Sequence, residues 1–338
     1  MQSTTQMEGP ALPPAVAVVI PYFQRKPGIL ARALESVFAQ DYVQPFDLLI
    51  VDDESPVPAQ SELAGLQAPA HVRVSILGQK NGGPGAARNA GLDEACRRGI
   101  EIVAFLDSDD RWSQDHLRRG IEAIGHGFDI YAANWSLLGE SDDQADAHSA
   151  RGLIDADFEP FEVIAGTGRF LRPLLTQQLQ GSVLKMSALV FNFQRFQDVR
   201  FNTSLRNASE DRLFTYELGL TQPKVLLSRR MEVFSGTGVN IYASATWGSA
   251  QSYPVYRDQL AGTRIALKLL RGHPKERELV KQQRREIQES LARHSLHMFA
   301  QRQSFDKKIL AKIILLEPMV LFRAVMVVIR QIWAKVVK

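Results

Sequence analysis

The sequence predicts an α/β fold with a mostly parallel sheet and helices on both faces. Short apolar, β-branched runs alternate with helical patterns over the first 110 residues, which is typical of a parallel sheet. Most of these runs lack an alternating polar face, as expected for strands that are buried on both sides. Acidic or glycine-rich clusters follow the runs, at the strand ends where ligands of open α/β sheets bind.

The elements follow from hydrophobic periodicity. Apolar runs predict strands at 16–20, 48–51 and 102–106, and a later one at 183–193. Alternation of Val72, Val74 and Ile76 predicts a half-buried strand at 72–76. Helical spacing predicts helices at 29–38, from residue 86 onward, at 209–218 and within 259–303. Ser209 is the expected N-cap of the third of these helices. The segments 136–150 and 235–253 are expected to be loops.

Length and composition indicate a globular chain with a substantial core. Its 338 residues are 45% apolar and 23% charged, with one cysteine, which excludes an internal disulfide. We expect a flexible leader without signal-peptide character at 1–14, an α/β domain at 15–253, a helical extension at 254–306 and an amphipathic tail at 307–338.

The positive charge is concentrated at one end. The net charge is +3, and the tail carries seven basic residues and one acid, so residues 1–306 carry −3. A nucleic-acid binder should spread positive charge over its folded face, so this class is disfavoured.

The sharpest motif is Asp107-Ser108-Asp109-Asp110, with three carboxylates in four residues directly after a predicted buried strand. Carboxylates this close repel one another. A divalent cation relieves the repulsion, and Mg²⁺ or Mn²⁺ binds a few carboxylates together with phosphate oxygens. A polar turn before a helix would use the same residue types.

Three weaker motifs lie at other predicted strand or helix ends. Asp52 and Asp53 follow a strand and could accept hydrogen bonds from a base or a ribose. The glycine turn from Asn81 to Asn89 contains Arg88 and opens a helix, where anions are favoured. Glu210 and Asp211 could supply a general base. Each has an ordinary structural alternative, as a turn or a helix cap.

In this order the motifs resemble those of bacterial family 2 glycosyltransferases, which have the Rossmann-like GT-A fold. The resemblance covers roughly residues 14–235 and rests on Val18–Tyr22, Val51–Ser55, Asn81–Asn89, Phe105–Asp110 and Ser209–Asp211. The segment Gly236–Tyr242 is also similar to exopolysaccharide glucosyltransferases of the succinoglycan type.

The resemblance implies roles for individual residues. Pro21 and Tyr22 would lie against the nucleobase, and Asp53 with Asp52 would bind the base or ribose. Asn81 and Arg88 would lie near the nucleotide, with Glu210 also in contact with substrate. Asp107 would touch the ribose or the metal shell, Asp109 would coordinate Mg²⁺ or Mn²⁺, and Asp211 would be the catalytic base. No histidine lies between His148 and His273, so the remaining metal ligands stay open.

The implied reaction is the transfer of one sugar with inversion, from a nucleoside-diphosphate sugar to a growing, lipid-linked oligosaccharide. UDP-glucose is the family's default donor, and the processive Gln-x-x-Arg-Trp motif is absent. Tyr242 and Trp247 would close over the donor and acceptor, or else anchor the core.

The tail has an apolar face and a basic stripe of Lys308, Lys312, Arg323 and Arg330 if it is helical. Charges interrupt every long apolar stretch, so a spanning helix is not expected. The pattern favours a helix at the inner face of the cytoplasmic membrane. Packing on the domain or in an oligomer is the alternative.

Two other functions use similar residues. A sugar nucleotidyltransferase also needs a nucleotide, a metal and carboxylates, but should have a glycine-rich, basic loop after the first strand. A non-catalytic nucleotide-sugar-binding protein would have lost the carboxylates, and Asp107, Asp109 and Asp211 are all present.

Overall fold

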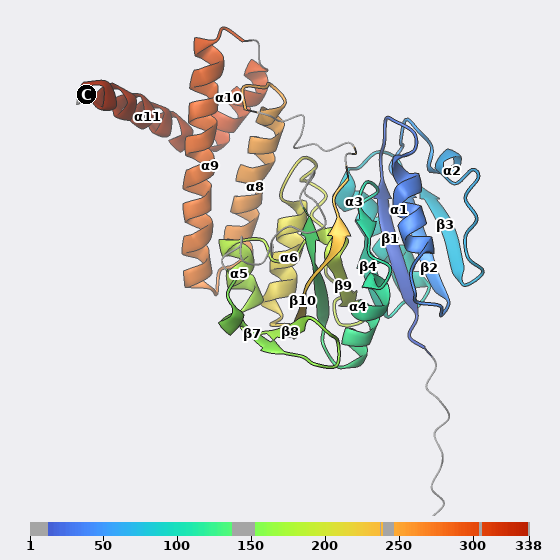
Figure 1. Cartoon of the computed structure of the whole chain (residues 1–338). Helices are drawn as coiled ribbons and strands as arrows, with labels where there is room; N and C mark the ends of the chain where they lie inside the picture. Colours follow the sequence, from blue (N-terminus) through green and yellow to red (C-terminus); the bar gives the residue numbers. More distant parts are fainter. Residues whose placement is uncertain (1–12, 137–152, 237, 239–246, 304–305, 337–338) are drawn as a thin grey trace, which may run out of the picture.

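The computed structural model describes residues 13–136, 153–236, 238, 247–303 and 306–336 (Figure 1). Almost all of the predicted leader and of the loop 136–150 lies outside these ranges, as does Tyr242. Side chains are described as far as residue 329.

The first four long strands form the predicted parallel half of the sheet. They are β1 (Val16–Tyr22), β2 (Phe46–Asp52), β3 (Val72–Gly78) and β4 (Ile102–Phe105), in the order β3-β2-β1-β4. Each prediction lies within about two residues of the observed element. Continuous apolar runs identify β1, β2 and β4 well because both faces of these strands are covered. The edge strand β3 is only partly buried and shows alternation instead.

The second half of the sheet is mixed. The strand β9 (Leu189–Asn192) runs antiparallel between β4 and β6 (Ile130–Ser136), and β6 pairs in parallel with β10 (Val225–Phe234). The remaining strands pair antiparallel and are β5 (Arg111–Trp112), β7 (Phe158–Pro160) and β8 (Thr167–Phe170).

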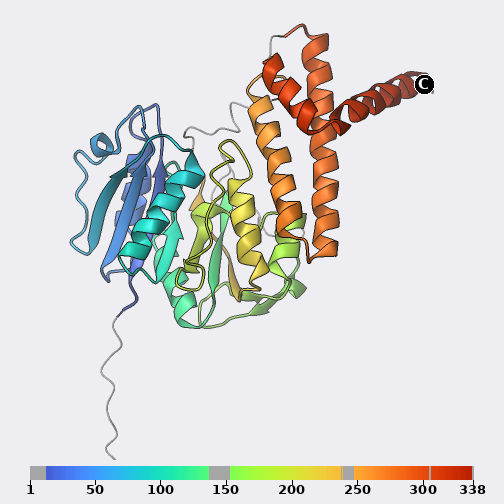
Figure 2. The same cartoon turned by 180° about the vertical axis from the view of Figure 1, so that it is seen from behind.

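Helices cover both faces of the sheet (Figures 1 and 2). Side chains of β1 alternate between the two layers: Val18 and Ile20 share a core cluster with α1 (Ile29–Phe38) and α4 (His116–Gly125). Ala17 and Val19 share the other with α3 (Pro84–Arg97) and α6 (Glu210–Leu220). The short helix α2 (Ala59–Glu62) lies beyond β2.

A helical arm stands beside the sheet (Figure 1). It consists of α8 (Ser252–Leu269) and α9 (Pro274–Ala300), and α5 (Leu174–Gln180) packs near its base. The predicted helical region 259–303 is therefore two helices, and the first begins inside the predicted loop 235–253. Pro274 occupies the first turn of α9, a position that proline favours.

One local prediction is wrong, and another is confirmed only for the position of the residue. The run 183–193 is not one strand, because a 3-10 turn (Met186–Ala188) precedes β9. Ser209 stands at the N-cap position of α6, but its φ is 73° and its side chain makes no capping hydrogen bond. Both residues that break the pattern, Ser187 and Ser209, lie beside the acidic motifs.

The tail folds as two helices, α10 (Lys307–Leu316) and α11 (Met319–Val336). Glu317, between them, is 3% exposed and pairs with Arg264 of α8 and Arg284 of α9. Within the described part of the chain, no helix has the length and apolar character needed to cross a membrane.

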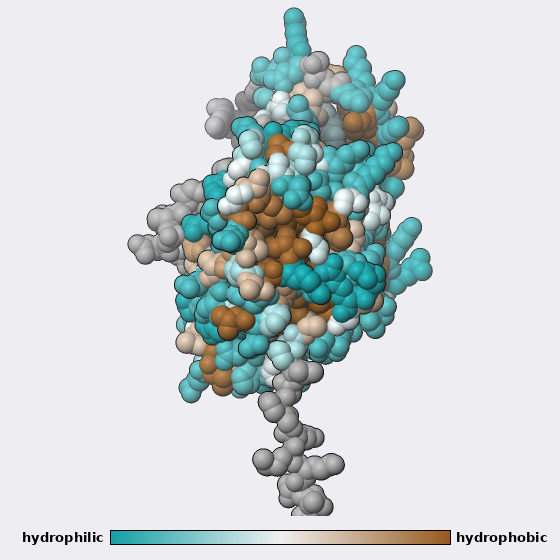
Figure 3. Space-filling model, turned by 90° about the vertical axis from the view of Figure 1, so that its right-hand side faces the viewer, coloured by the Kyte–Doolittle hydropathy of each residue, from teal (hydrophilic) through white to brown (hydrophobic). Residues whose placement is uncertain are grey.

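The opposite end of the sheet is the edge strand β3 (Figure 3). Apolar side chains gather near the middle of this face, and hydrophilic ones surround them. Arg73 of β3 pairs with Asp47 of β2 at 2.5 Å, and charges of this kind protect an edge from further strand pairing.

Candidate functional site

The acidic turn after β4 and the start of α6 meet at one buried arginine. Arg88, near the start of α3, is 5% exposed. Its Nη2 donates to Asp107 Oδ1 at 2.6 Å, and its Nη1 lies 3.6 Å from Glu210 Oε1. Its guanidinium also lies over the Phe201 ring, 5.3 Å from the centroid. The structure thus brings together three of the predicted motifs.

The ion pair changes the pKa of both partners in the expected direction. Burial lowers the pKa of Arg88, but the charges of Asp107 and Glu210 outweigh it and raise this pKa above its usual value. Burial opposes ionisation of Asp107, yet Arg88 and Lys185 lower its pKa. Asp107 is therefore held as a carboxylate, with its side chain 30% exposed.

The two acids at the start of α6 have different environments. Glu210 is 8% exposed, and burial together with the charge of Asp211 raises its pKa to about 7. Asp211 is only half-buried, and its charge also reaches Arg88. Of the pair, Asp211 is the one open to a substrate, as the predicted base must be.

Asp109 lies under a glycine-containing segment that follows β10. Gly238 N donates to Asp109 Oδ2 at 2.8 Å. A Cβ on Gly236 would stand 1.5 Å from Asp109 O, so only glycine fits there. Burial and the charges of Asp107 and Asp110 raise the pKa of Asp109, as expected for crowded carboxylates without a cation.

The last acid of the turn is fixed by residues that the sequence analysis missed. Asp110 Oδ2 lies 2.7 Å from Lys185 Nζ and accepts from Ser187 Oγ at 2.5 Å. Ser187 Oγ also accepts from the backbone N–H of Asp107 at 3.1 Å. The available signal was Lys185 itself, the only charged residue in the apolar run 183–193.

Asp53 joins β2 to the glycine turn. Its carboxylate accepts from Gly82 N and Gly83 N at 2.8 Å each, and from Gln79 Nε2 at 2.7 Å. Asn81 Nδ2 donates to the Asp53 carbonyl at 3.0 Å. Asp53 therefore shapes the turn that leads to Arg88, and Asn81 is bonded to Asp53 within it.

Three of the predicted nucleotide contacts are directed elsewhere. Asp52 accepts from Ser55 N and Ala59 N, both at 2.8 Å, which holds the loop before α2. Pro21 and Tyr22 are buried in β1, and burial raises the pKa of Tyr22 to about 12. Pro21 and Tyr22 therefore present no free surface to a base, and both carboxylate oxygens of the partly exposed Asp52 are engaged by the backbone.

Trp247 lies away from the other predicted site residues. It is 57% exposed and contacts His294 and His297 of α9, with ring centroids at 5.4 and 5.7 Å. The structure therefore associates Trp247 with the helical arm. Neither anchoring in the core nor contact with the acidic turn describes this position.

The donor set fits a divalent cation that is completed by its substrate. Among the described residues, no group of three or more His, Cys, Asp or Glu side chains forms a ready metal site. Mg²⁺ commonly binds one or two carboxylates together with substrate phosphates. Asp109 and Asp107, on one turn, match that smaller protein share.

Helix α8 fixes the loop that precedes α6 and leads to Asp211. Asp258, which is 2% exposed, accepts from Arg206 N at 3.1 Å and from Asn207 N at 2.9 Å. A Cβ on Gly262 would lie 2.8 Å from Ser209 Cβ. The arm thus packs directly against the start of α6, which periodicity alone could not predict.

Comparison with known proteins assigns this geometry to a family. The family model for Glycosyl transferase family 2 matches residues 17–175. The succinoglycan biosynthesis protein ExoW of Rhizobium meliloti is 36% identical over 295 residues, which are 85% of this chain and 88% of that protein. ExoO of the same organism is 40% identical over 129 residues, or 38% of this chain and 34% of that protein.

A solved structure shows the same fold at low identity. The crystal structure of S. aureus TarS 1–349 in complex with UDP-GlcNAc has a TM-score of 0.53 and 17% identity, over 85% of this chain and 73% of that one. The likeness supports the GT-A fold that the motifs predict. The motifs meet through Arg88, and a relative matches most of the length of this chain. The chain therefore belongs to glycosyl transferase family 2.

Proposed function

We propose that this glycosyltransferase moves a single sugar from a nucleoside-diphosphate sugar to a saccharide hydroxyl, with inversion. The observation that best supports this proposal is the bridge from Asp107 through Arg88 to Glu210 at the start of α6. It connects the acidic turn, where a diphosphate would bind, with the start of α6, where Asp211 is the more exposed of the two acids.

In the proposed step, Asp211 removes the proton from the acceptor hydroxyl. The acceptor oxygen forms a bond to the anomeric carbon from the face opposite the leaving group. The bond from that carbon to the diphosphate oxygen breaks, and its electron pair leaves with the nucleoside diphosphate. Arg88 is already paired with Asp107 and Glu210, so its part is to hold these two side chains in place.

Asp109, with Asp107, would hold a Mg²⁺ or Mn²⁺ ion against the diphosphate. Such an ion neutralises negative charge on the departing group. The crowding of three carboxylates on one turn supports this assignment, because a bound cation would relieve the repulsion of Asp109 by Asp107 and Asp110.

The relatives support the identity of the substrates. ExoW and ExoO are named for succinoglycan biosynthesis, and TarS has been crystallised with UDP-GlcNAc. We infer that this chain uses a UDP-sugar, with glucose as the expected sugar, and extends a lipid-linked oligosaccharide of an exopolysaccharide.

The tail supports a location at the inner face of the cytoplasmic membrane. Large apolar side chains of α10 and α11 are exposed, and they are Leu315, Leu316, Met319, Leu321, Phe322, Val325, Val328 and Ile329. Exposed Lys308 and Lys312 lie on α10. Arg323 does not join this exposed basic stripe as predicted, because it lies 3.6 Å from Glu289 of α9. The side chain of Arg330 lies outside the described residues.

Such a surface suits a helix that lies in the membrane interface and does not cross it. The buried pairing of Glu317 holds the two tail helices on the arm. The protein would thereby face an acceptor that is carried on a lipid.

Donor turnover tests the proposed activity. The purified chain is offered a panel of nucleotide sugars with Mg²⁺ or Mn²⁺, with and without EDTA, and released nucleoside diphosphate and donor binding are measured. We expect slow hydrolysis of one UDP-sugar that stops with EDTA. Failure of every donor to bind, with or without metal, would contradict the proposal.

A further inference from the structure

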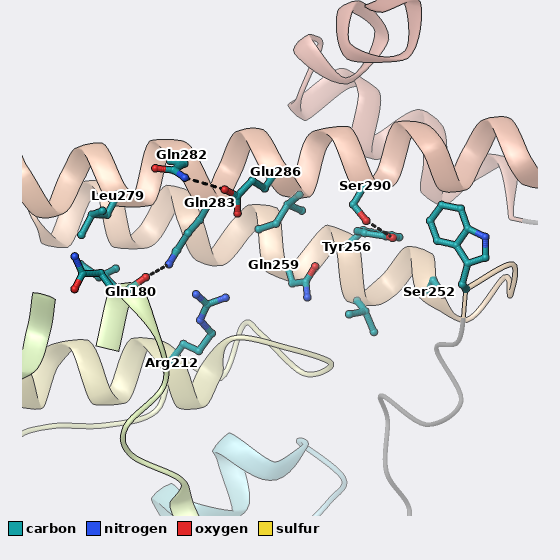
Figure 4. Close-up of a pocket in the computed structure, with 14 residues that line it drawn as sticks. Gln180, Arg212, Ser252, Tyr256, Gln259, Leu279, Gln282, Gln283, Glu286 and Ser290 are labelled. Atoms are coloured by element: carbon teal, nitrogen blue, oxygen red, sulfur yellow. Dashed lines mark hydrogen bonds between the residues drawn. The ribbon is translucent and has the colours of Figure 1, made fainter. Parts of the chain in front are cut away.

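A groove lined by polar and apolar side chains lies beside the contact between the start of α6 and the helical arm (Figure 4). Its volume is about 710 Å³, within the range of roughly 300–1,000 Å³ that is typical of ligand sites. Its walls come from the ends of α5 and α6, from α8 and from α9. Neither the acidic turn nor Arg88 lines it, so it is distinct from the donor site.

The side chains that line the groove are those that suit a sugar. Arg212 of α6 and Gln259 of α8 point into the same space (Figure 4), and neither side chain has a hydrogen bond or an ion pair with a described residue. Both can therefore donate to hydroxyl groups. Trp247 and Tyr256 provide aromatic surface at one end, and aromatic rings combine apolar area with rigidity.

The charge of the groove favours a neutral ligand. Arg212 and Glu286 are the only charged side chains among the lining residues. They have opposite signs, so their formal charges cancel. Amides and hydroxyls make up the rest of the polar surface, and the Tyr256 and Ser290 hydroxyls already contact each other at 2.9 Å. A diphosphate or another polyanion would need more cations than this.

The position of the groove connects it to catalysis. Asp211 itself does not line the groove, but Arg212, which follows it directly in α6, does. Asp258 and Gly262 of α8 pack against the loop before Asp211, and Gln259 is next to Asp258. From Leu279 to Ser290 the wall extends along α9 for about 16 Å at 1.5 Å per residue, which is enough for several sugar rings in a row.

From these observations we propose that the groove binds the acceptor as a neutral oligosaccharide of more than one residue, with its terminal hydroxyl directed to Asp211. This inference rests on the proposed transferase activity and adds the place and chemical class of the second substrate. It also gives Trp247 a role, in acceptor binding on the arm.

Calorimetric titration tests the groove without a donor. The probes are neutral glucose and galactose tetrasaccharides of different linkages, with a tetragalacturonate as the charged comparison. We expect the full-length protein to bind at least one neutral probe, and to bind the charged probe at least about tenfold more weakly. The variants Gln259→Ala and Trp247→Ala should each weaken neutral binding by about tenfold or more, which corresponds to 1.4 kcal/mol.

Gln301→Ala is the matched control, because Gln301 is an exposed glutamine at the end of α9 outside the groove. It should bind the probe as the unmodified protein does. The inference is overturned if no neutral probe binds, or if both groove variants bind it with unchanged affinity. Because donor turnover is measured separately, that result is distinguishable from failure of the proposed activity.

Discussion

At the scale of single residues, Arg88 determines how the site is built. A guanidinium that is 5% exposed is costly to bury unless it is paired. It is paired twice, with Asp107 at 2.6 Å and with Glu210 at 3.6 Å. A lysine could not span both carboxylates with the same planar group, so the motif requires an arginine here.

Glu210 makes stability depend on pH. Its folded pKa of about 7 lies above the usual value of 4.5, so the folded state binds more protons between these values and stability falls as pH rises through them. Glu210→Gln should remove this contribution of about 3 kcal/mol. Denaturant unfolding of both proteins at pH 4.5 and 7.5 measures it. Equal pH dependence of the two proteins would contradict the assignment.

Lys185 should matter for stability because Asp110 is buried beside it. Lys185→Met leaves Asp110, whose side chain is 5% exposed, without its cation. We expect the free energy of unfolding to fall by about 1–3 kcal/mol. Lys268→Met, at an exposed position of α8, is the control and should change it by less than about 0.5 kcal/mol. Similar values for both variants would rule out a structural role for the Lys185 pair.

At the scale of elements, α8 serves both as a wall of the groove and as a support for the loop that leads to Asp211. Asp258 holds the backbone N–H groups of Arg206 and Asn207. Gly262 allows the helix to approach Ser209 closely. The position of Asp211 therefore depends on a helix that the motifs themselves do not contain.

Gly262→Ala tests this close approach through the sign of its effect. In an open helix, Gly→Ala stabilises by about 1 kcal/mol. At Gly262 the new Cβ would meet Ser209 Cβ at 2.8 Å, so we expect destabilisation of about 1–3 kcal/mol and slower transfer. Gly125→Ala in α4, where a Cβ meets nothing within 4 Å, should be neutral or stabilising. A stabilised Gly262→Ala protein would show that α8 does not press on the loop.

The predictable elements are those whose burial is visible in a local pattern. The helix 29–38 and the strand that begins at Val16 were predicted within two residues. The run 183–193 misled because apolar character alone does not distinguish a strand from a turn. The 3-10 turn in this run contains Ser187, whose hydroxyl donates to Asp110. This contact joins residues far apart in the sequence, so no local pattern reports it.

The candidate site likewise contains residues that local motifs predict and residues that only tertiary packing reveals. Asp107, Arg88 and Glu210 were predicted from motifs and do meet. Lys185 and Asp258 were missed because their roles depend on tertiary packing. Asp52 and Tyr22 were placed in the site by their position at strand ends and by the family resemblance, but the side chain of Tyr22 is buried and a local turn engages Asp52.

At the scale of the whole molecule, the acidic turn, the groove and the tail occupy successive parts of the chain. The sheet supplies the acidic turn, the arm supplies the groove and the tail carries the exposed apolar surface. How the arm sits against α6 could not be predicted, because helix periodicity reports a buried face but not its partner. The groove is a product of that packing.

The tail should bind anionic membranes. In a flotation assay with vesicles that contain an anionic lipid, we expect the full-length protein to rise with the vesicles, and less so at high salt. A Leu321→Ser, Phe322→Ser, Val325→Ser variant, changed only at exposed positions, should lose most of this binding. A Val43→Ser, Val163→Ser variant is the control, since both residues are exposed elsewhere. Full-length protein that stays with the unbound fraction would contradict the proposal.

The most direct measurement compares wild type with Asp211→Asn, for both donor binding and release of nucleoside diphosphate from the UDP-sugar that the panel identifies. Loss of the base should slow release by about 10²–10⁴-fold, while the donor dissociation constant stays within about twofold, because the proposed role of Asp211 is toward the acceptor and not the donor. An Asp211→Asn protein that releases nucleoside diphosphate at nearly the wild-type rate would contradict the assignment of Asp211 as the base.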